Sequence, residues 1–130
     1  MNEPTREAVQ QWLARAKVDW QTVEILSSHG ESPGESICFH CQQYVEKLLK
    51  ALLTLRGVEA PRTHDLRRLI QLAAPHAPEL AALAAAADSL TEHAVAMRYP
   101  DEWHDLEPEE VQEMVADARQ FADVLLPNLR

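Results

Sequence analysis

The chain has 130 residues, 46% of them apolar, so it can fill one hydrophobic core and leaves little room for a second domain. No apolar run approaches the roughly 18 residues of a membrane span, and residues 1–6 lack the layout of a secretory signal. The net charge of −9 makes the chain as a whole a poor non-specific binder of nucleic acid, because phosphate contacts need local positive charge. We therefore expect a single cytoplasmic domain over residues 1–130 without membrane contact.

Two long helices are predicted first in chain order, because apolar residues recur at steps of three and four. The first spans about residues 5–28, with Thr5 as a plausible N-cap. The second spans about residues 35–56 and ends at Gly57, as a C-cap glycine would end it. The two apolar stripes are Val9, Trp12, Ala16, Trp20, Val23 and Leu26, and then Ile37, Cys41, Tyr44, Leu48, Leu52 and Leu55.

Three further helices complete the pattern. A short one begins near Thr63 and ends before Pro75, and a fourth spans about residues 78–97. The last begins at Pro108, a favourable first-turn proline. Its stripe consists of Val111, Met114, Ala118, Phe121 and Leu125. No segment alternates long enough to predict a strand, and the connections are short. The sequence therefore predicts an all-α, up-and-down bundle of four to five helices.

Cys38 and Cys41 match the spacing C-x-x-C inside the second predicted helix. A redox motif needs a preceding strand, and a zinc site needs a second pair of ligands with suitable spacing. Neither accompanies this pair, and no spacing among the six histidines suggests a metal. We expect two buried free cysteines, no metal site and no cofactor.

The second helix also has a polar side, which includes Gln43, Glu46, Lys47 and Lys50. Periodicity alone predicts a solvated face with a Glu46–Lys50 pair. Half of the basic residues lie between residues 47 and 68. This stretch could meet phosphate, meet an acidic patch on a partner, or be solvated, and all three interpretations stay open.

The longest gap between predicted helices, about residues 98–107, contains residue types suited to RNA cleavage. The guanidinium of Arg98 can hold a phosphate by paired hydrogen bonds, and the imidazole of His104 can move a proton at neutral pH. Trp103 offers a face on which an unpaired base can stack. The alternative is an ordinary loop in which Arg98 pairs with Asp101 or Glu102 and Trp103 pins the loop to the bundle.

Four blocks, taken in order, resemble a HEPN domain and together span most of the chain. They are Ala16-Lys17-Val18-Asp19-Trp20, the run from Gln42 to Leu53 that reads QQYVEKLLKALL, Thr63-His64-Asp65-Leu66, and Arg98-Tyr99-Pro100-Asp101. The resemblance implies a bundle of four or five helices that associates as a homodimer.

The resemblance also implies a site. Many HEPN proteins are metal-independent endoribonucleases, with an arginine, four to six residues, and then a histidine after the penultimate long helix. Arg98 and His104 match this signature, and in the family two such motifs meet across the dimer interface to form one site. One subgroup, controlled by nucleotide transfer, has a tyrosine two residues after the histidine. This chain has Leu106 there, which puts such control in doubt.

Three functions remain open at this stage. The first is a metal-independent endoribonuclease, the toxin-like half of a module with a small nucleotidyltransferase. The second is a non-catalytic accessory subunit that binds a nucleotide or a nucleotidyltransferase partner, with Gln43, Lys47, Lys50, Tyr99 and Trp103 as binding residues. The third is a structural dimer whose acidic C-terminal helix contacts another protein.

Overall fold

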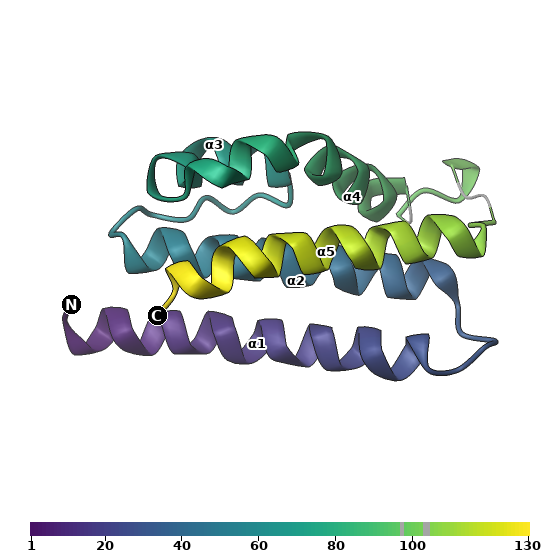
Figure 1. The fold of residues 1–130 in the computed structure, drawn as a ribbon, viewed down its shortest axis with the longest axis horizontal. Coiled ribbons are helices and arrows are strands. Elements are labelled where there is room, and N and C mark those ends of the chain that lie inside the picture. Colours follow the sequence, from purple (N-terminus) through teal and green to yellow (C-terminus); the bar gives the residue numbers. More distant parts are fainter. Residues whose placement is uncertain (97, 103–104) are drawn as a thin grey trace.

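The computed structural model describes residues 1–96, 98–102 and 105–130, and this part of the chain is helical without strands. Figure 1 shows the helices as layers, with α1 along one edge, α2 and α5 in the middle, and α3 and α4 along the other edge. The predicted all-α bundle is thus confirmed. The α-helices are α1 (Glu3–Ser27), α2 (Gly34–Leu55), α3 (Leu66–Ala73), α4 (Ala84–Ala96) and α5 (Pro108–Asn128). The 3₁₀ turns are η1 (Ala74–His76), η2 (Pro78–Leu83) and η3 (Pro100–Glu102).

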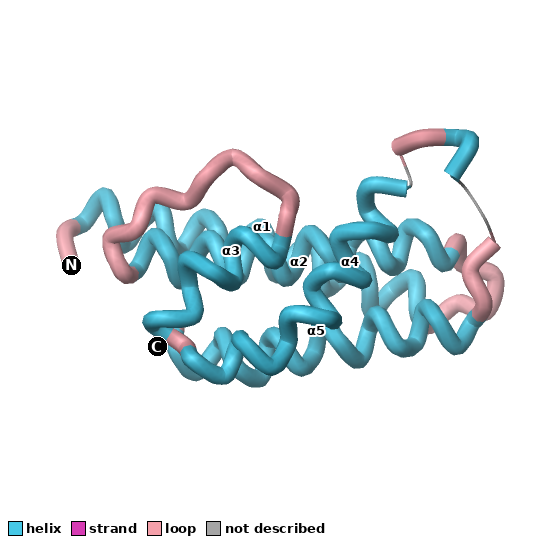
Figure 2. Tube along the Cα trace, turned by 90° about the horizontal axis from the view of Figure 1, so that it is seen from above, coloured by secondary structure: helices cyan, strands magenta, loops and turns pink. Residues whose placement is uncertain are grey.

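α2 is the central helix, and α1, α3, α4 and α5 each pack against it. Seen from above, α5 runs along one side of the bundle and the connection between α2 and α3 along the other (Figure 2). Because neighbours surround it, α2 buries adjacent leucines such as Leu48 and Leu49, and Leu52 and Leu53, rather than a single stripe. Its sequence is accordingly apolar over more than half of its circumference.

The predicted stripes face this centre. Val9, Ala16 and Val23 of α1 are buried, whereas Trp12, Trp20 and Leu26 are partly buried at the margins. On α5 the residues Met114, Ala118, Phe121 and Leu125 are buried. Burial of aliphatic and aromatic side chains at these positions is the main term that stabilises the bundle.

The helix ends confirm one predicted cap and correct two. Gly57 adopts φ +72°, and the N–H of Val58 donates to the carbonyl of Leu53 at 2.8 Å, as expected for a C-cap glycine. α1 is capped by Asn2, whose side chain accepts from the N–H of Thr5. α3 is capped by Asp65 rather than Thr63.

The fourth helix begins with a 3₁₀ turn. Residues 78–83 form η2, and the regular α-helix starts at Ala84. Such turns are frequent at helix N-termini, where bonds to the third residue back tighten the first turn.

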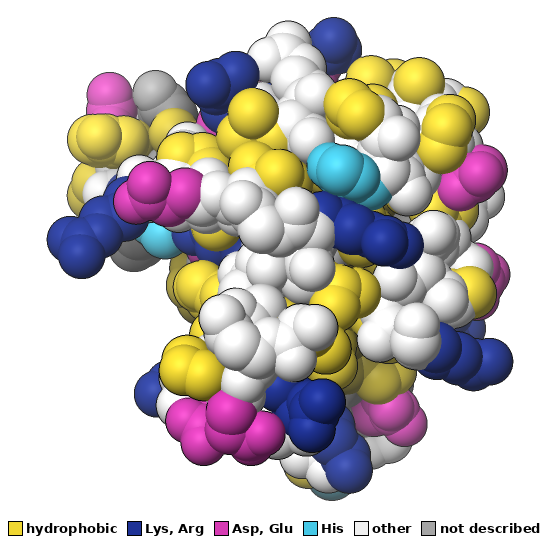
Figure 3. All heavy atoms as spheres, turned by 90° about the vertical axis from the view of Figure 1, so that its left-hand side faces the viewer, with side chains coloured by type: hydrophobic (Ala, Val, Ile, Leu, Met, Phe, Trp, Pro, Cys, Tyr) yellow, Lys and Arg dark blue, Asp and Glu magenta, His cyan; other side chains and the backbone are white. Residues whose placement is uncertain are grey.

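None of the described helices is both long and apolar enough to cross a membrane. Figure 3 shows the end of the bundle where α1 begins, with Lys and Arg side chains at separate places among other side chains. Within the stretch between residues 47 and 68 the four arginines lie beyond the last residue of α2, and all of them are exposed: Arg56, Arg62, Arg67 and Arg68.

Candidate functional site

Arg98, the predicted phosphate-binding residue, follows the last residue of α4 by two positions. Its backbone N–H donates to the carbonyl of Val95, and that of Tyr99 donates to the carbonyl of Ala96. These two bonds tie the backbone of residues 98 and 99 to the last turn of α4. The side chains of both Arg98 and Tyr99 are exposed, and Tyr99 is 53% accessible.

The guanidinium of Arg98 makes no ion pair with Asp101 or with any other described carboxylate. The Arg98–Asp101 pair of the ordinary-loop alternative is therefore not formed, whereas its Arg98–Glu102 pair and the role of Trp103 rest on side chains outside the described residues and stay predictions. The predicted base His104, the predicted stacking residue Trp103 and the side chain of Glu102 lie outside the described part of the chain. Of the predicted catalytic pair, the structure therefore describes Arg98 but not His104.

Two of the acidic residues that follow Arg98 in the sequence have structural roles. Glu107 is the N-cap of α5, and it forms a capping box with Glu110. The carboxylate of Glu110 accepts from the backbone N–H of Glu107 at 3.2 Å and lies 3.9 Å from Nε2 of His93. The carboxylates of Glu107 and Glu110 therefore stabilise the first turn of α5, whereas Asp101 and Asp105 are exposed.

The polar side of α2 is not the solvated face that periodicity predicts. Glu46 and Lys50 are only 4% and 7% exposed, and Nζ of Lys50 lies 3.1 Å from the Glu46 carboxylate. The predicted pair is confirmed, but its solvation is wrong. The reason is tertiary: Trp12 of α1 covers Lys50, with its ring centroid 5.6 Å from Nζ.

Glu46 also holds the connection between α2 and α3. Its carboxylate accepts from Nδ1 of His64 at 2.8 Å and from Nε2 of Gln42 at 3.1 Å. The amide of Gln42, which is fully buried, donates as well to the backbone carbonyl of His64 at 2.9 Å. We call Gln42, Glu46, Lys50 and His64 the Glu46 network; it joins residue 64 to the middle of α2.

A second buried carboxylate links α1 to α2. Asp19 is 5% exposed and lies 2.8 Å from Nδ1 of His40 and 2.5 Å from Nζ of Lys47. Each buried carboxylate thus has one histidine and one lysine as partners. Burying such charges is tolerated only where they are paired and hydrogen-bonded.

The predicted binding residues of α2 therefore share a face but are already bonded within the bundle. Lys47 pairs with Asp19, Lys50 pairs with Glu46, and Nε2 of Gln43 donates to the side chain of Gln42 at 2.8 Å. An anionic ligand would have to compete with a carboxylate for either lysine. Their role in binding a nucleotide or a partner stays a prediction.

Cys38 and Cys41 are free and buried on α2. Burial raises the pKa of both thiols to about 12, so very little thiolate is present at neutral pH. Among the described residues no group of His, Cys, Asp or Glu is arranged to hold a metal ion.

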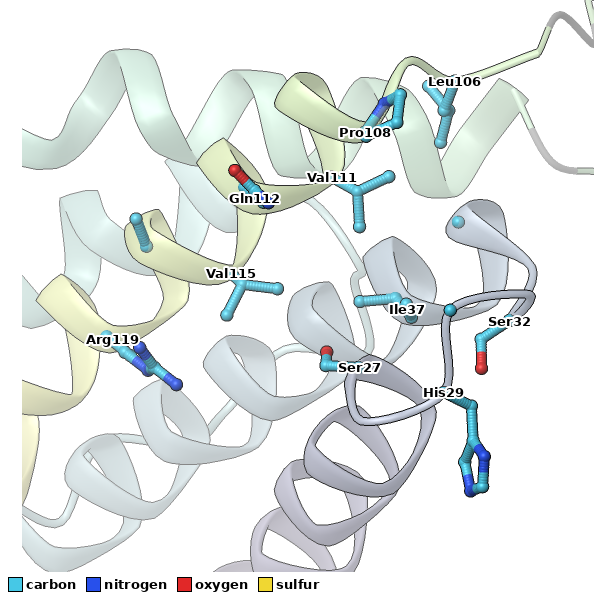
Figure 4. Close-up of a pocket in the computed structure, with 13 residues that line it drawn as sticks. Ser27, His29, Ser32, Ile37, Leu106, Pro108, Val111, Gln112, Val115 and Arg119 are labelled. Atoms are coloured by element: carbon cyan, nitrogen blue, oxygen red, sulfur yellow. The ribbon is translucent and has the colours of Figure 1, made fainter.

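A hollow of about 480 Å³ lies between the α1–α2 turn and the first half of α5 (Figure 4). Ile37, Val111 and Val115 form its apolar floor, and Ser27 and Arg119 stand among its polar lining residues. Of the predicted site residues that the structure describes, none lines this hollow.

Sequence reasoning missed Asp19 and Gln42 as parts of the buried networks. One signal for Asp19 was available, because it follows Ala16 by three residues and precedes Val23 by four, on the buried stripe of α1. A carboxylate at such a position requires a partner. Gln42 gave a comparable signal, because Cys38, Val45 and Leu49 lie four residues before it, three after it and seven after it on one apolar side of α2. The α2–α3 connection covers it there and supplies the backbone carbonyl of His64 as an acceptor.

The chain folds as a small helical bundle. Side chains of its central helix, α2, pair with the buried carboxylates of Asp19 and Glu46, and an exposed arginine follows α4. The profile of the HEPN domain matches residues 9–128, nearly the whole chain. This chain therefore belongs to the HEPN domain family. Neither the curated proteins nor the solved structures contain a significant match to it.

Proposed function

We propose that this chain is a metal-independent endoribonuclease of the HEPN type that acts as a homodimer. In this proposal Arg98 binds the scissile phosphate and stabilises the charge that develops on it, and His104 acts as general base or acid. Two chains each supply one Arg98–His104 motif to a shared site. The proposal extends to a module in which a small nucleotidyltransferase is the partner protein.

The observation that supports the proposal is that the side chain of Arg98, just beyond the end of α4, is exposed and makes no ion pair with a described carboxylate. An arginine in this state can offer its paired donors to a phosphate without first breaking an internal contact. The lysines of α2 cannot, because Asp19 and Glu46 already hold them. This contrast favours the nuclease over a nucleotide-binding accessory subunit.

The chemistry needs no metal and no co-reactant. A base removes the proton of a ribose 2′-hydroxyl, and that oxygen attacks the adjacent phosphorus while the bond from phosphorus to the 5′-oxygen breaks. The leaving oxygen takes up a proton from an acid. The products are a 2′,3′-cyclic phosphate on one fragment and a 5′-hydroxyl on the other. An arginine stabilises the transition state because negative charge builds on the phosphate oxygens.

Replacing His104 with alanine should abolish this activity. We expect the purified wild-type protein to cleave single-stranded RNA in the presence of EDTA and to leave a cyclic phosphate, because proton transfer by an imidazole replaces the metal. Loss of a general acid–base group lowers rates by about 10²–10⁴-fold. The measurement is gel analysis of end-labelled RNA, and robust cleavage by His104→Ala would sink the assignment. Co-purification with a nucleotidyltransferase and no RNA cleavage by the wild type would favour the accessory subunit instead.

A further inference from the structure

The outer side of α1, opposite its buried stripe, carries a second regular pattern. Six of its exposed residues lie along one line at alternating steps of four and three, which is the spacing of the a and d positions of a coiled coil. They are Glu7, Gln11, Ala14, Val18, Gln21 and Ile25. Val18 is 60% exposed and Ile25 is 61% exposed. Scattered exposed apolar residues are ordinary, so the inference depends on how this face is shaped and charged.

Two shallow hollows lie on α1. One, of about 290 Å³, is bounded by Glu7, Gln10, Gln11 and Ala14. Four residues at this spacing form the hole that receives one side chain of a facing helix in a coiled coil. The other hollow, of about 570 Å³, lies further along the helix and includes Lys17, Gln21 and Glu24 in its lining. The face thus has two projecting aliphatic side chains and two recesses.

The charges that flank this face complement one another. In this pattern Val18 and Ile25 occupy a positions. Lys17 and Glu24 directly precede them, so they lie two turns apart on the same flank of the face. Neither has an ion-pair partner among the described residues. In an antiparallel pair of identical helices this flank faces the same flank of the other copy, so a lysine and a glutamate on it can pair twice by symmetry.

We propose that a second copy of this chain docks on this face through its own α1, antiparallel, in one register. Ile25 then lies opposite the partner's Ala14 and enters the hollow beside it, and Val18 lies opposite the partner's Gln21. Lys17 meets the partner's Glu24, and the reverse pair forms by symmetry. Sliding the pairing by one heptad would set Lys17 against the partner's Lys17, or Glu24 against the partner's Glu24. Like charges at such positions are unfavourable, so the charges select the register.

This contact differs from the one that would join two Arg98–His104 motifs. In Figure 1, α1 and η3 lie on opposite sides of α2, so pairing through α1 leaves the two copies of η3 far from each other. A chain that uses both contacts forms an assembly of more than two copies. The α1 contact can therefore be tested independently of the nuclease proposal.

Cysteine cross-linking tests the register directly. Ala14→Cys and Ile25→Cys are prepared as separate proteins, mixed and mildly oxidised. The native thiols of Cys38 and Cys41 do not compete, because they are buried and their pKa lies at about 12. We expect a disulfide that joins one Ala14→Cys chain to one Ile25→Cys chain, and little cross-linking of either protein alone. The control mixes Ile25→Cys with Gln120→Cys, another exposed position, on α5.

The charge pair is tested on the same cysteine proteins. Adding Lys17→Glu to both should lower the cross-linked yield about tenfold through like-charge contact, and adding Glu24→Lys as well should restore it. RNA cleavage by Lys17→Glu alone should equal that of the wild type. A yield from the Ala14→Cys and Ile25→Cys mixture no higher than that of the control pair, or a yield insensitive to Lys17→Glu, would overturn the α1 contact and leave the nuclease proposal untouched.

Discussion

Replacing Glu46 with alanine should lower the free energy of unfolding by about 3–5 kcal/mol, a large share of the roughly 5–15 kcal/mol typical of a folded domain. The side chain of Lys50, which is 8% exposed in the wild-type structure, would lose its countercharge. The amide of Gln42 would lose one acceptor, and His64 would lose the contact that fixes the α2–α3 connection. Urea denaturation followed by far-ultraviolet circular dichroism measures the change.

The matched control removes an exposed carboxylate. Asp88 pairs with Arg67 at 2.6 Å on the surface, and because such pairs are screened by water, Asp88→Ala should leave stability nearly unchanged. The double variant Glu46→Leu with Lys50→Met should recover much of the loss, since removing both charges together leaves neither of them unpaired. A Glu46→Ala protein as stable as Asp88→Ala would contradict the role given to the Glu46 network.

Replacing Arg98 with alanine should lower the rate of RNA cleavage about 10²–10³-fold, the usual loss when one donor that stabilises transition-state charge is removed. Arg98→Lys should be intermediate, because an ammonium keeps the charge but cannot form paired hydrogen bonds with one phosphate. Neither change should alter the unfolding temperature, since the side chain is exposed without an ion pair to a described carboxylate. Single-turnover cleavage of a labelled RNA in EDTA gives the rates.

Arg56→Ala provides the comparison for this effect. Arg56 is also an exposed arginine that follows a helix, but it belongs to the end of α2 and begins the α2–α3 connection. The Arg56→Ala protein should cleave RNA at the wild-type rate. Equal rates for Arg98→Ala and Arg56→Ala would remove Arg98 from the site.

The bundle could be predicted from the sequence because each long helix has a local pattern of apolar residues and terminating residues that indicates it. The stripe of α5 from Met114 to Leu125 and the glycine at position 57 are patterns within one helix, and both appear in the structure as expected. N-caps were less predictable. Asn2 and Thr5, and likewise Asp65 and Thr63, are competing cap residues close in sequence, and local propensity does not rank them.

The burial of Glu46 and Lys50 could not be predicted in this way. Periodicity groups residues on one side of a helix but does not say which other segment covers that side. Trp12 and His64, which lie far from them in sequence, shield the two charges from water. The family resemblance gave Arg98 and His104 as a pair by spacing alone, and the structure adds the exposed state of Arg98, without an ion pair to a described carboxylate.

Subunit mixing tests the central claim most directly, namely that two chains share one catalytic space. Arg98→Ala and His104→Ala are each expected to cleave RNA at least about a hundredfold more slowly than the wild type. Their mixture is allowed to exchange subunits before RNA is added. About half of the randomly paired dimers then contain one intact guanidinium and one intact imidazole in the shared site. The account predicts that cleavage returns in the mixture. A mixture as inactive as its two parents would contradict it.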